Sequence, residues 1–377
     1  MKILFVVATF NVGGAERHTL DLVHSLSQRH NSCVFASVKS RKEAALDLQS
    51  LDEGAIFSCE AKRFLDLQAL RSLICEIEKY SPDVVVAVNQ YALMYLHLAK
   101  TFSNSTFRIA VVFHSTKLVS QKDEFLHWFY QHLFKRSDLL VFVCDFQANY
   151  WKARGLSAMC VETVHNGVDT ERFSPDTTNA RQKVRSDFGI AQSDFVIGIT
   201  AAFRPEKNHA FLLRALAQLR LSGIPAKLLL VGDGPLRTAL EVEASSLGVY
   251  EDVAFAGVQS DVRPFIAAFD VFALVSFTEA FSLAALEAMA MGIPAVLSDV
   301  GGAREMVVDG ETGFVFQTDD VEQFIAAMNA LRENDTAKVM GMAAHRFVNA
   351  HFTHKSMVDR YEQLFGALVP QGMRDRR

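Results

Sequence analysis

Hydrophobic residues in this chain gather into short continuous runs, and the segments between the runs have the spacing of helices. The first run, Lys2–Ala8, passes through a glycine turn at Asn11–Glu16 into a helix-like segment that ends near Arg29. Short apolar runs of this kind predict parallel strands that are buried on both faces. The further strands predicted in this first series are Asp83–Val88, Arg108–Phe113, Leu139–Cys144 and Cys160–His165. The helices predicted between them are about 66–80, 91–102, 123–135 and 146–154.

A second series of strands and helices begins near Phe195. Its predicted strands are Val196–Ala201, Lys227–Val231, Val253–Ala256, Val271–Leu274, Ala295–Leu297 and Gly313–Phe316. Its predicted helices are about 208–221, 235–247, 261–267, 283–291, 302–307, 320–332 and 335–350. This alternation predicts a parallel sheet and a Rossmann-like domain in each series. A length of 377 residues suits two such domains, and the turn-rich segment His165–Pro175 lies between them.

Composition narrows the classes of function. The net charge of −5 argues against a nucleic-acid-binding protein, and a chain with 50% hydrophobic and 21% charged residues is normal for a globular protein. The five cysteines form no Cys-x-x-Cys pair, so we expect neither a disulfide framework nor a zinc site. The sequence shows no secretory signal and no apolar run of membrane-spanning length, so we expect a cytoplasmic protein.

The most informative segment of the chain is 276–316. Two carboxylates in it, Glu279 and Glu287, stand eight positions apart. A helix is predicted to begin between them, because Ser282 is a good N-cap and Leu283–Met291 is rich in helix formers. The N–H groups in the first turn of a helix can hold an anion such as phosphate. This layout suits a nucleotide-sugar, with the sugar near the first carboxylate, the diphosphate at the helix start and the ribose near the second carboxylate.

This segment resembles the retaining nucleotide-sugar glycosyltransferases of the GT-B fold, in the large Glu-x7-Glu family known as glycosyltransferase family 4 or glycosyl transferases group 1. The resemblance implies an α/β protein with two Rossmann-like domains whose parallel sheets face across a central cleft. It implies an acceptor-binding domain at 1–170 and a donor-binding domain at 171–353, with the last helix, from about 354, packing back on the first domain.

The resemblance also assigns the residues that bind the donor. Glu279 would contact the donor sugar, Glu287 the ribose, and the backbone near Val258 the base. Where the family usually has glycine, this chain has Ala280, which would narrow the sugar pocket or require a negative φ. The donor-binding residues that we predict are Gly14, Arg204, Lys207, Val258, Glu279, Ala280, Phe281, Ser282, Leu283 and Glu287.

Two cations, Arg204 and Lys207, stand three positions apart on the loop after the first strand of the second domain. They match the family's Arg-x-x-Lys pair, which implies that they stabilise the charge of the leaving nucleoside diphosphate. By itself, the pattern would fit a solvated surface pair. The turn Gly232–Pro235 after the next strand either brings backbone close to the ligand or serves only as a structural turn.

The first domain offers two candidates at the ends of predicted strands. His114 follows the strand Arg108–Phe113, and Asn89 follows Asp83–Val88. The carboxyl ends of parallel strands are where ligands of α/β proteins bind, and Asn89 is predicted to reach the acceptor from there. The resemblance implies that His114 hydrogen-bonds the donor sugar or helps to position the acceptor. A packed core histidine is the alternative for His114. The catalytic residues that we predict are Arg204, Lys207, Glu279 and His114.

An aromatic-rich stretch that ends in basic residues covers 125–136. One interpretation is peripheral contact with the inner face of the cytoplasmic membrane, near a lipid-linked acceptor. The interpretation that we favour is a helix packed against the core, because apolar residues fall on most of its faces.

The resemblance implies a retaining, hexosyltransferase-type enzyme that moves a sugar from a UDP-sugar or GDP-sugar to a saccharide or lipid-linked acceptor, in cell-envelope polysaccharide, lipopolysaccharide or glycolipid synthesis. Acidic and Cys/His motifs at metal-ligand spacing are missing, so we expect no metal ion and no other cofactor. Two alternatives stay open: an epimerase or sugar-phosphate synthase on the same fold, and a silent nucleotide-sugar-binding subunit. The sequence does not indicate an oligomeric state.

Overall fold

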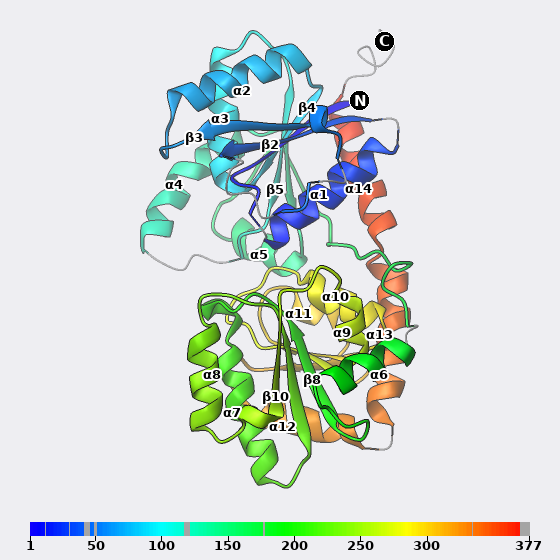
Figure 1. Ribbon diagram of the computed structural model, residues 1–377. Helices are drawn as coiled ribbons and strands as arrows, with labels where there is room; N and C mark the ends of the chain where they lie inside the picture. The colour runs from blue at the N-terminus through cyan, green and yellow to red at the C-terminus, as the bar shows by residue number, and fades with distance from the viewer. Residues whose placement is uncertain are drawn as a thin grey trace. The chain divides into compact units, whose positions relative to one another are not determined.

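The computed structural model describes residues 1–369 apart from 12, 30, 41–45, 49–50, 117–120, 176–177 and 334, and for 121–127 and 178 it describes the backbone alone. The chain divides into two compact units (Figure 1). Unit 1 comprises Met1–Asn166 and the C-terminal segment from Lys355, and unit 2 comprises Gly167–His354. The boundaries expected from the sequence, after residues 170 and 353, lie four residues and one residue from these.

Unit 1 is built on a parallel sheet of seven strands in the order β3-β2-β1-β4-β5-β6-β7. The strands are β1 Lys2–Val7, β2 Ser32–Lys39, β3 Ile56–Ala61, β4 Val84–Val88, β5 Arg108–Phe113, β6 Leu139–Phe142 and β7 Cys160–Thr163. The helices are α1 Gly14–Ser27, α2 Leu67–Tyr80, α3 Asn89–Phe102, α4 Gln121–Lys135, α5 Asp145–Lys152 and α14 His354–Leu368, with a short 3-10 helix η2 at Glu53–Ala55. The order places β1 and β4 side by side, so the chain reverses direction across the sheet between them.

Strands β2 and β3 of this sheet were not predicted. The interior of β2 is buried, but Ser37 interrupts its apolar run, and the hydroxyl of Ser37 donates to the carbonyl of Lys39 (2.9 Å). Strand β3 lies at the sheet edge and is only partly buried, so its residues are mixed in polarity. The other strands were predicted from continuous apolar runs. In β2 a buried, hydrogen-bonded serine interrupts that run, and in β3 the edge position allows polar residues.

Unit 2 is built on a parallel sheet of six strands in the order β10-β9-β8-β11-β12-β13. The strands are β8 Phe195–Thr200, β9 Ala226–Val231, β10 Val253–Gly257, β11 Val271–Leu274, β12 Ala295–Ser298 and β13 Gly313–Phe316. The helices are α6 Thr178–Asp187, α7 His209–Leu221, α8 Arg237–Ser246, α9 Arg263–Ala267, α10 Leu283–Ala290, α11 Ala303–Met306, α12 Val321–Arg332 and α13 Thr336–His351, with 3-10 helices η3 at Pro205–Lys207 and η4 at Tyr250–Asp252. The prediction of two Rossmann-like α/β domains with parallel sheets is therefore confirmed.

Helix α6 was not predicted, because its residues are mostly polar. It is held in place by Arg185, which is fully buried. The guanidinium of Arg185 donates to the carboxylate of Asp270 (2.7 Å) and to the carbonyls of Ala268 (3.0 Å) and Asp194 (3.0 Å). A buried cation with these acceptors anchors a helix whose sequence carries little apolar signal.

The last helix, α14, packs on unit 1 beside α1 (Figure 1). The rings of Tyr361 and His18 lie with their centroids 5.7 Å apart, and those of Phe365 and Phe5 lie 6.1 Å apart. Arg29 adds an ion pair with Asp359 at the surface. Aromatic contacts with α1 and β1 thus bring the C-terminal helix to the N-terminal sheet.

Helix α4 carries the aromatic stretch at 125–136, of which the side chains of 125–127 lie outside the described residues. Tyr130 and Phe134 are buried in the core of unit 1, as the packed-helix interpretation expects, whereas Trp128 and Phe129 are exposed. In the described part of the chain, no helix has both the length and the apolar composition needed to span a bilayer.

Candidate functional site

In unit 2, the loop after β8 carries Arg204 and Lys207. It leads through η3 to Asn208, whose φ of 53° ends the 3-10 turn, and α7 begins at the next residue. Arg204 is exposed, and Lys207 is partly buried. The loop leaves the carboxyl end of a central strand of the sheet, which is where ligands of open α/β sheets bind.

Glu279 lies beside this loop. Its Oε2 atom is 2.5 Å from Nζ of Lys207, and the two side chains are 21% and 24% exposed. The backbone joins the same two segments, because the N–H of Phe277 donates to the carbonyl of Glu206 (2.9 Å). The structure thus brings together two of the predicted catalytic residues, which come from segments 72 positions apart.

The turn at Gly232–Pro235 supports the loop that carries Arg204. Gly232 has a φ of 141°, and a Cβ atom there would lie 2.1 Å from the carbonyl oxygen of Ala201. The N–H of Phe203 donates to the carbonyl of Asp233 (2.9 Å), and the N–H of Leu236 donates to that of Phe203 (3.1 Å). Of the two roles considered for this turn, close packing against the loop is the one that the described contacts support.

A second glycine pair, which the sequence analysis did not single out, supports Glu279. Gly301 has a φ of 56°, and a Cβ atom there would lie 1.9 Å from the carbonyl oxygen of Glu279. The N–H of Gly302 donates to the carbonyl of Ala280 (2.8 Å). Ala280 itself is not among the described residues with positive φ. The signal that could have revealed this support is a Gly-Gly pair placed shortly after a predicted strand.

Helix α10 begins next to Glu279. Ser282 is its N-cap, and the Ser282 hydroxyl accepts a hydrogen bond from the N–H of Ala285 (3.3 Å). The N–H groups of Leu283 and Ala284 have no intrahelical acceptor because they lie in the first turn. The positive end of the helix dipole adds to their attraction for an anion. The start of α10 can therefore hold a phosphate group.

The remaining predicted donor residues of unit 2 differ in exposure. Glu287 lies in α10 and is buried. The side chain of Phe281 is buried as well, and its ring packs against Phe352 with centroids 5.3 Å apart, so Phe281 can offer a ligand only its backbone. Val258 follows β10 and is 78% exposed.

In unit 1, the two predicted acceptor residues contact each other. Asn89 begins α3 with a φ of 63°, and its Oδ1 accepts a hydrogen bond from the N–H of His114 (2.8 Å). His114 is partly buried, its ring lies beside that of His18 with centroids 5.1 Å apart, and desolvation lowers the pKa of His114 to about 4. Its Nε2 atom has no hydrogen-bond partner among the described residues. His114 is therefore a neutral imidazole at physiological pH.

The segment after His114 is fixed by helix α5. The amide of Gln147 and the indole of Trp151 both donate to the carbonyl of Ser115, at 2.9 and 2.7 Å. At the start of α1, a Cβ atom on Gly14 would meet nothing within 4 Å. Packing against the described structure therefore does not require a glycine at position 14.

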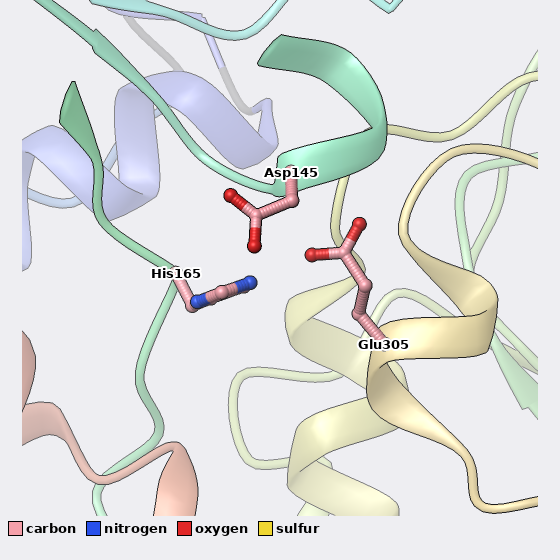
Figure 2. A group of neighbouring side chains, drawn as sticks. All are labelled: Asp145, His165 and Glu305. Atoms are coloured by element: carbon pink, nitrogen blue, oxygen red, sulfur yellow. The ribbon is translucent and has the colours of Figure 1, made fainter. Parts of the chain in front are cut away.

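Asp145 and His165 form a polar pair in unit 1 that the sequence analysis did not discuss. Asp145 begins α5, His165 follows β7, and their side chains approach within 4.8 Å (Figure 2). Glu305, also labelled in Figure 2, belongs to α11 of unit 2. A bound zinc ion takes at least three protein ligands, and Asp145 and His165 supply two, so we assign no metal site to the described residues of unit 1.

Two family models match the chain. The model described as Glycosyltransferase Family 4 matches residues 12–172, and the model described as Glycosyl transferases group 1 matches residues 180–347. Together they extend over most of both units.

Individual relatives agree with these matches. The chain is 29% identical over 304 residues to the N-acetyl-alpha-D-glucosaminyl L-malate synthase of Bacillus anthracis, covering 79% of this chain and 78% of the relative. It is 35% identical over 219 residues to the GDP-mannose-dependent alpha-(1-6)-phosphatidylinositol monomannoside mannosyltransferase of Mycolicibacterium smegmatis, covering 54% of this chain and 57% of the relative.

Among solved structures, the fold is similar to that of HepE from Anabaena in complex with UDP and glucose. The TM-score is 0.85 at 21% identity, over 97% of this chain and 100% of that one. It is also similar to WaaG, described as a glycosyltransferase involved in lipopolysaccharide biosynthesis, with a TM-score of 0.75 at 16% identity over 97% and 99% of the two chains.

Proposed function

Because the chain belongs to the GT-B glycosyltransferases of family 4 type, which bind nucleotide-sugars, we propose that it moves a sugar from a UDP-sugar or GDP-sugar to an acceptor hydroxyl, with retention at the anomeric carbon and without a metal ion. Unit 2 binds the donor in this proposal, and unit 1 binds the acceptor.

The observation that carries the proposal is the grouping of Lys207, Glu279 and the start of α10 in unit 2. Lys207 and the first-turn N–H groups of α10 hold the diphosphate, together with the exposed cation of Arg204. Glu279 accepts hydrogen bonds from sugar hydroxyls through the carboxylate lone pairs that the ammonium group of Lys207 does not use. Glu287 binds the ribose.

Charge stabilisation is the main chemical task of these residues. When the bond between the anomeric carbon and the phosphate oxygen breaks, negative charge grows on the leaving diphosphate. Fixed cations and helix N–H groups stabilise that charge in the transition state, which is how a site lowers a barrier. In this proposal, Lys207 and Arg204 supply the positive charge that a divalent cation supplies in other transferases.

The retaining course that we propose is front-face displacement. The acceptor oxygen bonds to the anomeric carbon on the face that the diphosphate leaves, and the departing phosphate oxygen takes the acceptor's proton. No side chain acts as a covalent nucleophile. Glu279 is a poor choice for that role because its carboxylate is paired with Lys207. His114, being neutral, orients a hydroxyl by hydrogen bonding and does not supply a proton.

The acceptor is a saccharide or a lipid-linked saccharide in cell-envelope synthesis. Support comes from the similar phosphatidylinositol monomannoside mannosyltransferase and from the fold neighbour WaaG, described as involved in lipopolysaccharide biosynthesis.

The experiment that tests the proposal is calorimetric titration of the protein with UDP, GDP, ADP and TDP in the presence of EDTA, followed by incubation of the preferred nucleotide-sugar with candidate acceptors. We expect one base to bind best without metal, and a glycosylated product whose α or β linkage matches that of the donor. Loss of all binding in EDTA would contradict metal independence. A product of opposite anomeric configuration would contradict retention. An altered free sugar formed without acceptor would indicate an epimerase instead.

A further inference from the structure

A pocket of about 780 Å³ opens in unit 1 at the carboxyl ends of β1, β2 and β3. Its lining residues come from the ends of these three strands, from the loop before α2 and from α3: Ala8, Lys39, Ser40, Ala61, Lys62, Arg63, Phe64 and Tyr91. Parallel sheets bind their ligands at this edge, and the volume lies in the range of small-molecule sites, roughly 300 to 1,000 Å³.

The charged residues that line this pocket are all positive. Lys39, Lys62 and Arg63 line it, and none of the lining residues is acidic. Lys62 and Arg63 are exposed, and Nζ of Lys39 lies 5.9 Å from the centroid of the Tyr91 ring. Three cations thus converge on one cavity without a lining carboxylate to neutralise them.

Two acidic side chains in the segments next to the pocket take part in local structure. Asp66 caps α2 and accepts hydrogen bonds from the N–H groups of Lys62, Gln68 and Ala69, at 3.1, 2.9 and 3.2 Å. Glu60 accepts one from the hydroxyl of Ser40 (2.5 Å). Both carboxylates keep their negative charge, but neither lines the pocket, so the three lining cations outnumber these two acidic side chains.

An aromatic wall completes the pocket. The rings of Phe64 and Tyr91 lie with centroids 5.3 Å apart, and the Tyr91 hydroxyl donates to the carbonyl of Phe64 (3.0 Å), which fixes the pair. Phe64 is nonetheless 59% exposed. An exposed aromatic face beside convergent cations is the composition of a site that binds a ring bearing an anionic group.

We propose that this pocket binds the acceptor, and that the acceptor is a sugar or polyol ring that carries a phosphate group. The proposal rests on the proposed function, since it assigns acceptor binding to unit 1. Lys62 and Arg63 bind the phosphate oxygens, Lys39 adds a third positive charge, and Phe64 with Tyr91 packs against the ring. Phosphate is favoured over a carboxylate because a phosphate monoester carries up to two negative charges and three acceptor oxygens, which three cations can satisfy.

The test uses glucose 6-phosphate and glucose as probes, titrated into the full chain by calorimetry, with UDP and GDP as separate titrants. The variant is Lys62→Gln with Arg63→Gln. The matched control is Lys135→Gln with Arg136→Gln, another adjacent and exposed Lys-Arg pair in unit 1. We expect glucose 6-phosphate to bind and glucose to bind much more weakly. The variant should weaken glucose 6-phosphate binding roughly tenfold or more, while the control leaves it unchanged.

Two outcomes would overturn the proposal: equal affinity for the two probes, or full glucose 6-phosphate affinity in the 62/63 variant. If the double variant does not fold, Lys39→Gln provides the same comparison with a single exposed change. Nucleotide binding separates this proposal from the proposed function. A protein that binds UDP or GDP but neither glucose 6-phosphate nor phosphatidic acid vesicles contradicts the phosphate acceptor alone, whereas one that binds none of the nucleotides contradicts the donor site.

A second arm distinguishes a soluble phosphate from a lipid-borne one. Vesicles of phosphatidylcholine, with and without phosphatidic acid, are sedimented with the wild type and with the 62/63 variant. Sedimentation that needs phosphatidic acid and is lost in the variant assigns the pocket to a lipid phosphate. Glucose 6-phosphate binding without sedimentation assigns it to a soluble one. If glucose 6-phosphate does not bind and the protein does not sediment with the vesicles, the proposal is overturned.

Discussion

Lys207 and Glu279 form an ion pair of 2.5 Å in unit 2, although they stand 72 positions apart in the sequence. Each side chain keeps about a fifth to a quarter of its surface exposed. Ion pairs that remain in contact with solvent contribute roughly 0 to 1 kcal/mol to stability. The fold does not depend on such a pair, so its value lies in fixing a cation and a carboxylate side by side where the donor binds.

Replacement of Lys207 tests this interpretation. We expect Lys207→Ala to lower turnover by about a hundredfold or more, because a cation that stabilises the leaving diphosphate is lost, while the melting temperature changes little. The control is Arg214→Ala, which removes a surface ion pair with Asp319 in the same unit and should leave turnover unchanged. Near-normal turnover of Lys207→Ala, measured with saturating donor, would remove Lys207 from the catalytic residues.

Gly301 gives a test of how the backbone of Glu279 is held. Both Gly301→Ala and the control Gly310→Ala place a side chain at positive φ, which costs about 1 kcal/mol of stability. Only at Gly301 would the new Cβ also collide with the carbonyl of Glu279, whereas nothing lies within 4 Å at Gly310. We therefore expect Gly301→Ala to weaken nucleotide-sugar binding, measured by calorimetry, and Gly310→Ala to leave it intact. Equal affinities of the two variants would show that the glycine pair does not position Glu279.

The buried Arg185 predicts a stability effect that is independent of catalysis. Asp270→Ala leaves the guanidinium of Arg185 buried without its carboxylate, and we expect this change to lower the free energy of unfolding by roughly 3 kcal/mol. Arg214→Ala, which removes the exposed ion pair with Asp319, should cost at most about 1 kcal/mol. The stabilities of the two variants can be compared by thermal unfolding, with circular dichroism as the signal. A similar small loss in both would mean that the carbonyl acceptors alone satisfy Arg185.

His114 predicts how stability depends on pH. Burial lowers its pKa to about 4 in the folded protein, below the unfolded value of about 6.5. The folded state therefore binds fewer protons there than the unfolded state, and the stability that neutral His114 retains above pH 6.5 is lost as pH falls toward 4. We expect His114→Gln to have a smaller decrease in melting temperature between pH 7 and 5 than the wild type. Parallel curves would show that His114 does not titrate as the desolvated site implies.

Local patterns in the sequence predicted much of the fold and of the donor site. Apolar runs such as Arg108–Phe113 and Val271–Leu274 match the observed strands, because strands buried on both faces need continuous hydrophobic residues. The start of α10 was predicted at Ser282 because capping depends on neighbours within one turn. Strand β3 and helix α6 were missed, since an edge position and one buried cation hold them rather than a periodic apolar pattern.

Only the tertiary structure decided which distant residues meet. Lys207 reaches Glu279, Gly301 packs under the carbonyl of Glu279, and Asn89 holds the backbone of His114. The sequence by itself determined the family, the two parallel-sheet domains and the residue types available for binding a nucleotide-sugar. It could not determine the cationic pocket that contains Lys62 and Arg63, because the residues of that pocket come from several separate strand ends. Their closeness follows from the order of strands in the sheet, which no local pattern specifies.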